Sequence, residues 1–233
     1  MPFYNVSRTN NMNKNVMTDF DTATTDEILG PLTATQQEAV RHVDGPLMIL
    51  AGPGSGKTRV VTHRIARLIA SGIPARQILA LTFTNKAADE MRLRLDRLAP
   101  RQPVWMGTFH RFCARLLRQH GAMVGLTENF TIYDMKDSAK LLDEALKDAS
   151  IKLSHVTPGQ VAHEISWAKS QLMTHEKYAG RPGKSVGAIV EQAYPVYQQR
   201  LLGANAVDFD DLLLHVATML RENPELRSTL DER

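Results

Sequence analysis

Residues 51–58, Ala-Gly-Pro-Gly-Ser-Gly-Lys-Thr, constrain the fold of this chain more than any other segment. They follow the apolar run 47–50 and precede residues 60–69, whose apolar side chains recur with helical spacing. Gly54 and Gly56 permit the positive φ angles of a tight turn, which lets backbone N–H groups approach an anion closely. A buried strand, a glycine-rich turn and a helix in this order predict a phosphate-binding P-loop.

The residues that end this loop predict its chemistry. The helix N-terminus adds a partial positive charge directed at the bound anion. Lys57 is expected to reach the β- and γ-phosphates of a nucleotide, and the Thr58 hydroxyl is expected to ligate Mg²⁺. The alternative is an ordinary glycine-rich turn between a strand and a helix, which the flanking pattern disfavours.

Composition excludes several classes of protein. The chain has 233 residues, of which 43% are hydrophobic, so it can bury a real core. Its net charge of +3 permits nucleic-acid binding but does not argue for it. The single cysteine, Cys113, rules out an intrachain disulfide, and its apolar surroundings favour a packed side chain over a nucleophile. No membrane-spanning or signal sequence is evident, and we therefore expect a cytoplasmic protein with no membrane partner.

Periodicity predicts an α/β fold. Residues 1–30 are expected to be a disordered tail, and folded sequence is expected from Pro31. A helix is expected over 32–43, with Thr33 as N-cap and Val43 among the inward-facing residues. Alternating strands and helices up to residue 133 predict a parallel sheet covered by helices. The expected strands are residues 47–50, 78–82, 104–107 and 130–133.

Beyond Tyr133 the pattern is helical. From 134 to about 206 we find amphipathic segments without a convincing strand, which predicts an all-helical subdomain. Pro195 is expected to kink or end one of these helices. From Val207 to residue 233 we expect a helix that returns to the first domain.

Two further segments leave predicted strands on the same side as the P-loop, where open α/β sheets bind ligands. Residues 82–88 and 107–111 each combine an aromatic ring with hydroxyl, amide and basic groups. This mixture suits single-stranded nucleic acid, because rings stack on bases while polar groups hold phosphates. The alternative makes the rings core residues and the threonines helix caps. The residues concerned are Phe83, Thr84, Asn85, Lys86, Thr108, Phe109 and His110.

Together these segments resemble superfamily 1 DNA helicases of the UvrD/Rep/PcrA group. Residues 32–40 resemble their Q-motif, 51–58 their motif I, 81–91 their motif Ia and 107–110 their motif Ib. Residues 207–213 resemble the stretch just before motif II. The resemblance implies a RecA-like P-loop NTPase sheet, domain 1A, over 31–133 and from 207, interrupted by helical subdomain 1B over 134–206.

The resemblance also implies roles for individual residues. Gln36 would hold the adenine of ATP, and Arg59 would line the nucleotide pocket unless it is simply a solvated helix residue. Lys57 and Thr58 would be the catalytic and Mg²⁺-binding residues. Asp210 and Asp211 could suggest a metal pair, but acidic residues at a helix start are more often caps. The remaining implied nucleotide-binding residues are Ala51, Gly52, Pro53, Gly54, Ser55 and Gly56.

The family's Asp-Glu pair, motif II, has no convincing match. Asp231-Glu232 lacks a buried strand before it, and Tyr133-Asp134 is followed by Met135. We therefore expect the N-terminal portion of a 3′→5′ repair helicase that binds ATP, Mg²⁺ and single-stranded DNA or a junction. Its other domains would come from a longer parent protein or a second chain.

Two alternatives remain. The first is a truncated module that binds ATP and single-stranded DNA without hydrolysis. The second, a small-molecule kinase that shares only the P-loop, would leave residues 32–40 unexplained.

Overall fold

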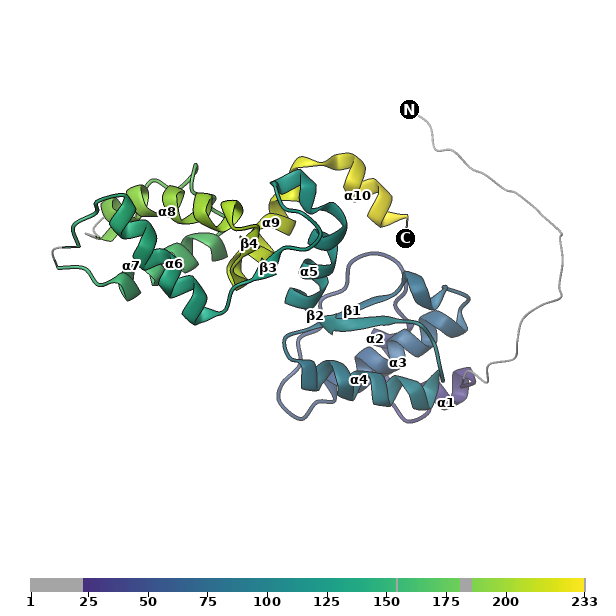
Figure 1. Cartoon of the computed structure of the whole chain (residues 1–233). Coiled ribbons are helices and arrows are strands. Elements are labelled where there is room, and N and C mark those ends of the chain that lie inside the picture. The colour runs from purple at the N-terminus through teal and green to yellow at the C-terminus, as the bar shows by residue number, and fades with distance from the viewer. Residues whose placement is uncertain (1–22, 154, 181–185, 233) are drawn as a thin grey trace, which may run out of the picture. The chain divides into compact units, whose positions relative to one another are not determined.

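The computed structural model describes residues 23–153, 155–180 and 186–232, which Figure 1 shows as ribbons. These residues form two compact units. The first unit contains the described residues up to Ala75 together with Met91–Pro103. The second contains Arg76–Glu90 and the described residues from Val104 onward. Among the residues described, no helix has the length and apolar character needed to cross a membrane.

The first unit is built around α3 (Lys57–Ala70). Helices α1 (Thr25–Leu29) and α2 (Ala34–Arg41) both pack against it. The C-terminal half of α4 (Asn85–Leu98) belongs to the same unit. Its core includes the buried side chains of Ile28, Val40, Ile65, Met91 and Leu95.

Helix α2 begins where the sequence predicts, but its end differs. The Thr33 side chain accepts a hydrogen bond from Gln36 N, so Thr33 is the expected N-cap. The helix ends at Arg41, and Val43 beyond it is exposed rather than inward-facing.

Helix α1 contradicts the expectation of a disordered tail up to residue 30. Thr24 caps this helix in a reciprocal capping box with Glu27. Ile28 and Leu29 are buried, and these apolar contacts order the segment. The rest of the predicted tail, residues 1–22, lies outside the described residues.

The apolar run before the glycine-rich loop is not a strand, contrary to the sequence prediction. Residues 46–50 have no regular secondary structure, and Met48 and Leu50 are 83% and 87% exposed. A strand requires hydrogen-bonding neighbours along its edges. No strand of the described residues pairs with this run, so its apolar pattern alone does not make it a strand.

In the second unit, β1 (Leu79–Thr82) and β2 (Trp105–Thr108) form a parallel pair. The first and last residues of both strands lie within one residue of the predicted bounds. Helix α5 (Phe109–His120) follows β2 directly and contacts both strands. Two short 3₁₀ helices, η1 (Ala75–Gln77) and η2 (Gly121–Val124), complete the connections.

A second parallel pair joins β3 (Thr131–Ile132) to β4 (Ala206–Val207). The described strands thus form two separate two-stranded sheets instead of the single sheet we predicted. Strand β4 escaped prediction because two residues are too short to show a period. The α/β class is confirmed, whereas the complete RecA-like sheet remains a prediction.

The chain enters a group of three helices through β3 and leaves it through β4. The group consists of α6 (Met135–Asp148), α7 (Pro158–Ser170) and α8 (Val186–Gly203), which pack on one another (Figure 1). Pro195 lies within α8 without ending it. Proline has no N–H to donate to the carbonyl of Glu191, four positions earlier, and Glu191 is an exposed residue.

Helix α9 (Phe209–Glu222) packs on α5 and α7, and α10 (Pro224–Asp231) follows it. Helix α9 begins two residues later than expected because Asp208 is its N-cap. Residues 227–230 belong to α10, which confirms that no strand precedes Asp231.

Candidate functional site: a glycine-rich loop and an aromatic strand-end surface

The glycine-rich loop of the first unit is an open turn before an uncapped helix. Gly54 and Gly56 have φ angles of 76° and 83°, in the region that glycine alone adopts without strain. Gly56 is the N-cap of α3 and offers no side chain to bond the first N–H groups of that helix. These N–H groups and the positive end of the helix dipole are therefore free to receive an anion.

The Lys57 ammonium lies over this loop. Its Nζ donates to Ala51 O at 3.2 Å and to Gly52 O at 2.8 Å. Both acceptors are neutral carbonyls, and no carboxylate among the described residues forms an ion pair with the exposed ammonium. Thr58 follows in the first turn of α3 and is half-buried. This donor set, cationic and rich in N–H groups, fits a triphosphate, and the Thr58 hydroxyl is a suitable Mg²⁺ ligand.

Gln36 links the start of α2 to the loop. Its Oε1 accepts from Thr33 N at 3.1 Å, and its Nε2 donates to Ser55 O at 3.0 Å. A glutamine amide has two N–H donors and two acceptor lone pairs. One donor and one lone pair of Gln36 therefore remain for a ligand such as adenine.

A cavity of about 560 Å³ opens between α2 and the loop. This volume lies within the range of small-molecule sites. Five of the predicted nucleotide-binding residues line it, whereas Pro53, Gly54, Gly56 and Thr58 do not. The lining residues are Thr33, Thr35, Gln36, Ala39, Ile49, Leu50, Ala51, Gly52, Ser55, Lys57, Val60 and Val61.

Arg59 faces a different hollow. It lines a space of about 290 Å³ with Arg94 and Arg97 of α4. The sequence offered two interpretations of Arg59, and this location separates it from the cavity that contains Gln36 and Lys57.

In the second unit, the register of β1 and β2 brings two aromatic segments together. Thr82 lies opposite Thr108 in the parallel pair, so the residues that follow emerge side by side. The rings of Phe83 and Phe109 have centroids 5.4 Å apart. Phe83 is 88% exposed, which is inconsistent with the alternative that it is a core residue.

The threonines of these segments are helix caps, as the alternative proposed. Thr84 Oγ1 accepts from Ala87 N, and Thr108 Oγ1 accepts from Arg111 N, both at 3.2 Å. Asn85 and Lys86 are exposed at the start of α4, beside Phe83 in the sequence. The caps hold the two helix starts in place while the rings and the basic group face solvent.

His110 extends this aromatic surface to Phe209, a residue that the sequence motifs do not predict. Its ring packs edge-to-face against Phe209, with centroids 6.0 Å apart. Phe209 is 51% exposed at the first position of α9. The signal available in the sequence was a phenylalanine set between acidic residues at a helix start, where an apolar side chain has little to pack against.

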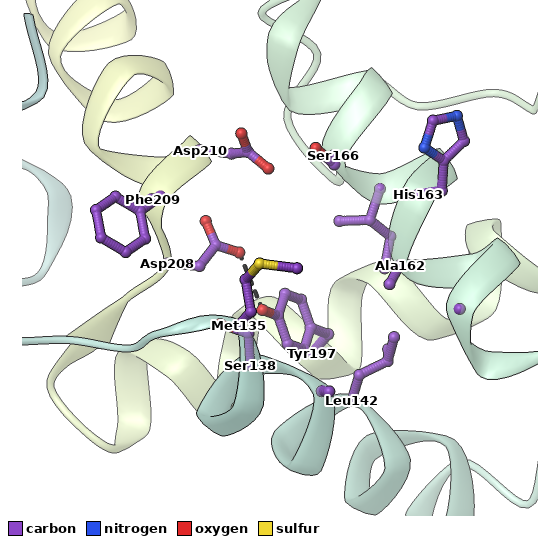
Figure 2. A pocket seen from close by; sticks show the side chains of 13 residues that line it. Met135, Ser138, Leu142, Ala162, His163, Ser166, Tyr197, Asp208, Phe209 and Asp210 are labelled. Atoms are coloured by element: carbon purple, nitrogen blue, oxygen red, sulfur yellow. Dashed lines mark hydrogen bonds between the residues drawn. The ribbon is translucent and has the colours of Figure 1, made fainter. Parts of the chain in front are cut away.

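Phe209 also borders a cavity of about 480 Å³. Figure 2 shows Asp208, Phe209 and Asp210 on one side of this cavity and Ala162, His163 and Ser166 of α7 on another. Asp208 and Asp211 cap α9 reciprocally, as expected for acidic residues at a helix start, and Asp210 lies in the same first turn. The interpretation of Asp211 as a cap is confirmed.

A buried ionic cluster beside this cavity was not predicted. Lys169 of α7 lies between Asp208 and Asp211, with Nζ–Oδ distances of 2.6 and 2.7 Å. Burial opposes the charge of Lys169, but the two aspartates outweigh it and raise its pKa. At Asp208, burial is the largest effect and raises the pKa of the carboxyl group. At Asp211, the attraction of Lys169 overcomes the effect of burial, and the pKa is lowered. In the sequence, Lys169 looks like an ordinary charged residue near a helix end.

Comparison with known proteins identifies what this chain is similar to. The profile of the UvrD/REP helicase N-terminal domain matches residues 32–233. The ATP-dependent DNA helicase UvrD1 of Mycobacterium bovis is 42% identical over 208 residues, which cover 86% of this chain and 27% of that protein. The ATP-dependent DNA helicase PcrA of Bacillus subtilis is 39% identical over 203 residues, covering 86% and 28% respectively. The chain thus spans little more than a quarter of the length of these relatives.

Proposed function

Because the chain belongs to the UvrD/REP helicase N-terminal domain family, we propose that it supplies the ATP-binding part of a DNA helicase. In this proposal it binds ATP with Mg²⁺ and also binds single-stranded DNA. The parent activity is ATP-dependent 3′→5′ unwinding in cytoplasmic DNA repair or replication restart. The names of the relatives, ATP-dependent DNA helicases, support this proposal for the whole enzyme.

The hydrogen bond between Gln36 and the P-loop is the observation that carries the nucleotide proposal. It brings an amide suited to adenine and a loop suited to phosphates to the same cavity. Gly54, Gly56 and the first N–H groups of α3 would hold the phosphates, and Lys57 would neutralise their charge. Thr58 would ligate Mg²⁺, which supplies charge stabilisation to the triphosphate when bound.

The exposed rings at the ends of β1 and β2 support the DNA proposal. Stacking of a base on Phe83 or Phe109 requires an open ring face, and Phe83 has one. Lys86 adds a positive charge near the start of α4 for the DNA backbone. Such a surface tolerates any base sequence, because every base has a face that can stack.

A second candidate is a module that binds both ligands without hydrolysing ATP. In the described residues none of the four strands is followed by an Asp-Glu pair. Asp134 is instead the N-cap of α6, and Asp231 is the last residue of α10. This observation favours binding without efficient turnover by these 233 residues.

ATP turnover, measured with and without single-stranded DNA, tests the second candidate. Turnover that DNA stimulates and that Lys57→Ala abolishes would refute it and would support an ATPase complete within this chain. Binding of both ligands with no turnover above the Lys57→Ala background agrees with both candidates, because the first one needs the other domains of the helicase. If the chain bound neither ATP nor single-stranded DNA, both candidates would be refuted.

A further inference from the structure

The buried Lys169 connects two segments that are distant in sequence. It lies on α7, and its two carboxylate partners, Asp208 and Asp211, lie 39 and 42 residues later at the start of α9. The Lys169 side chain is completely inaccessible to solvent, and so is that of Asp211. The contact therefore joins the helical group to α9 in an environment where a mispaired charge would be costly.

Helix α8 completes the cluster. Tyr197 donates its hydroxyl to Asp208 Oδ2 at 2.9 Å, which Figure 2 marks with a dashed line. Gln198 Nε2 lies 3.2 Å from both carboxylate oxygens of Asp211. The Lys169 Nζ also lies 5.1 Å from the centre of the Tyr197 ring. Each carboxylate thus has partners from two helices, which leaves it one favourable orientation.

The cluster holds the first turn of α9. Asp208 Oδ1 accepts from Asp211 N at 2.8 Å, and Asp211 Oδ2 accepts from Asp208 N at 3.3 Å. The same two side chains that bind Lys169 therefore also cap the helix. Phe209 and Asp210 lie between these two fixed points, with the Phe209 ring against His110.

A buried ion cluster is weak evidence of a stabilising role. Apolar residues of similar volume often replace a buried ion cluster with no loss of stability. An apolar contact, however, is less directional than paired charges and hydrogen bonds, which favour a particular geometry. The distinguishing property of this cluster is the orientation that it imposes on the start of α9.

We propose that Lys169 is a positioning residue for single-strand binding: by holding the capped start of α9 it keeps Phe209 beside His110, on the DNA-binding surface. This inference rests on the proposed function. The group of helices α6, α7 and α8 would thus help to shape the DNA-binding surface. The other rings of that surface lie just after β1 and β2.

A double-mutant cycle tests the inference with a fluorescent single-stranded oligonucleotide and the complete 233-residue chain. Phe209→Ala is expected to weaken binding about 5- to 150-fold, the effect of losing one stacking partner. Lys169→Met is expected to weaken it comparably. The double variant is expected to bind no more weakly than the weaker single variant, because Lys169 acts through Phe209. Independent, multiplicative losses would overturn the inference, since a purely structural role predicts them.

Two further variants keep the test decisive if Lys169→Met unfolds. Tyr197→Phe removes one hydrogen bond to Asp208 without changing any charge, and it should weaken DNA binding only when Phe209 is present. Arg200→Met is the matched control, because Arg200 pairs with Glu144 and Asp148 within the helical group. It should leave DNA binding unchanged.

The outcomes separate the inference from the proposed function. If both Phe83→Ala and Phe209→Ala bind DNA normally, the proposed DNA surface itself is wrong. If Phe209→Ala weakens binding while folded Tyr197→Phe and Lys169→Met do not, only the positioning role is wrong.

Discussion

Phe83 and Thr84 are neighbours in the sequence but have different roles in the structure. The Thr84 hydroxyl turns back to cap α4, while the Phe83 ring faces solvent. The sequence placed both residues in one segment suited to single-stranded nucleic acid, with Thr84 as a helix cap and Phe83 as a core residue in the alternative. The sequence could not separate them, because the direction of a side chain at a strand end depends on the register of the neighbouring strand.

The exposure of Phe83 leads to a prediction about DNA affinity. Phe83→Ala should weaken binding of single-stranded DNA by about 1–3 kcal/mol, with little dependence on base sequence. Thermal stability should hardly change, because the ring packs mainly against Phe109. Fluorescence anisotropy and thermal melts measure the two effects. Leu93→Ala removes another exposed apolar side chain and serves as the control. An equal loss of DNA affinity in the two variants would argue against stacking on Phe83.

Cys113 gives a prediction about reactivity. Burial raises the pKa of this thiol to about 11, from an ordinary value of 9.0. A shift of two units lowers the thiolate fraction near neutral pH about 100-fold, and the alkylation rate should fall accordingly. Iodoacetamide labelling of the native chain and of the chain in urea measures this ratio. Similar rates in the two states would contradict the buried placement.

The same pKa shift predicts how stability depends on pH. Because the folded-state pKa is higher than the unfolded one, folding favours the neutral thiol. This stabilisation is complete below about pH 9 and is lost as the pH rises towards 11. Cys113→Ala should lose less stability over that interval, as urea titrations at both pH values would show.

Among helices and strands, those marked by local sequence signals were predicted, whereas the pairing of strands was not. The cap of α2 at Thr33 and the extents of β1 and β2 follow from caps and apolar runs of sufficient length. The run 47–50 shows the limit, since an apolar strand pattern requires a partner that periodicity does not reveal. Strand β4 shows the opposite case: its two residues have no strand pattern in the sequence, and they form a strand because they pair with β3. The Lys169 cluster was beyond reach because its members come from three helices.

The glycine-rich turn at Gly56 gives a prediction about nucleotide affinity. Gly56→Ala should weaken Mg-ATP binding roughly tenfold or more, because alanine is strained at a φ of 83° and its Cβ would lie 3.0 Å from Gln36 Nε2. Gly45→Ala is the matched control, with a φ of 77° and open space around the added Cβ. Isothermal titration with thermal melts separates affinity from stability. If Gly56→Ala and Gly45→Ala lost ATP affinity equally, the loss would be caused by backbone strain alone and not by the contact with Gln36.

At the scale of the whole molecule, the two proposed activities belong to different compact units. The glycine-rich loop and its Gln36 contact lie in the first unit, while the aromatic rings that follow β1 and β2 lie in the second. The sequence motifs predicted both groups of residues, because each motif is a short continuous segment. The division of the chain between two units was not predictable from them, since it depends on contacts between distant segments.

Titration of the wild-type chain and of Lys57→Ala with Mg-ATP and, separately, with single-stranded DNA separates the two proposed binding sites. Lys57→Ala should lose Mg-ATP binding, because the phosphates lose their main positive charge, and it should retain the DNA affinity of the wild type. Unchanged affinity of Lys57→Ala for Mg-ATP would rule out residues 51–58 as the phosphate-binding loop.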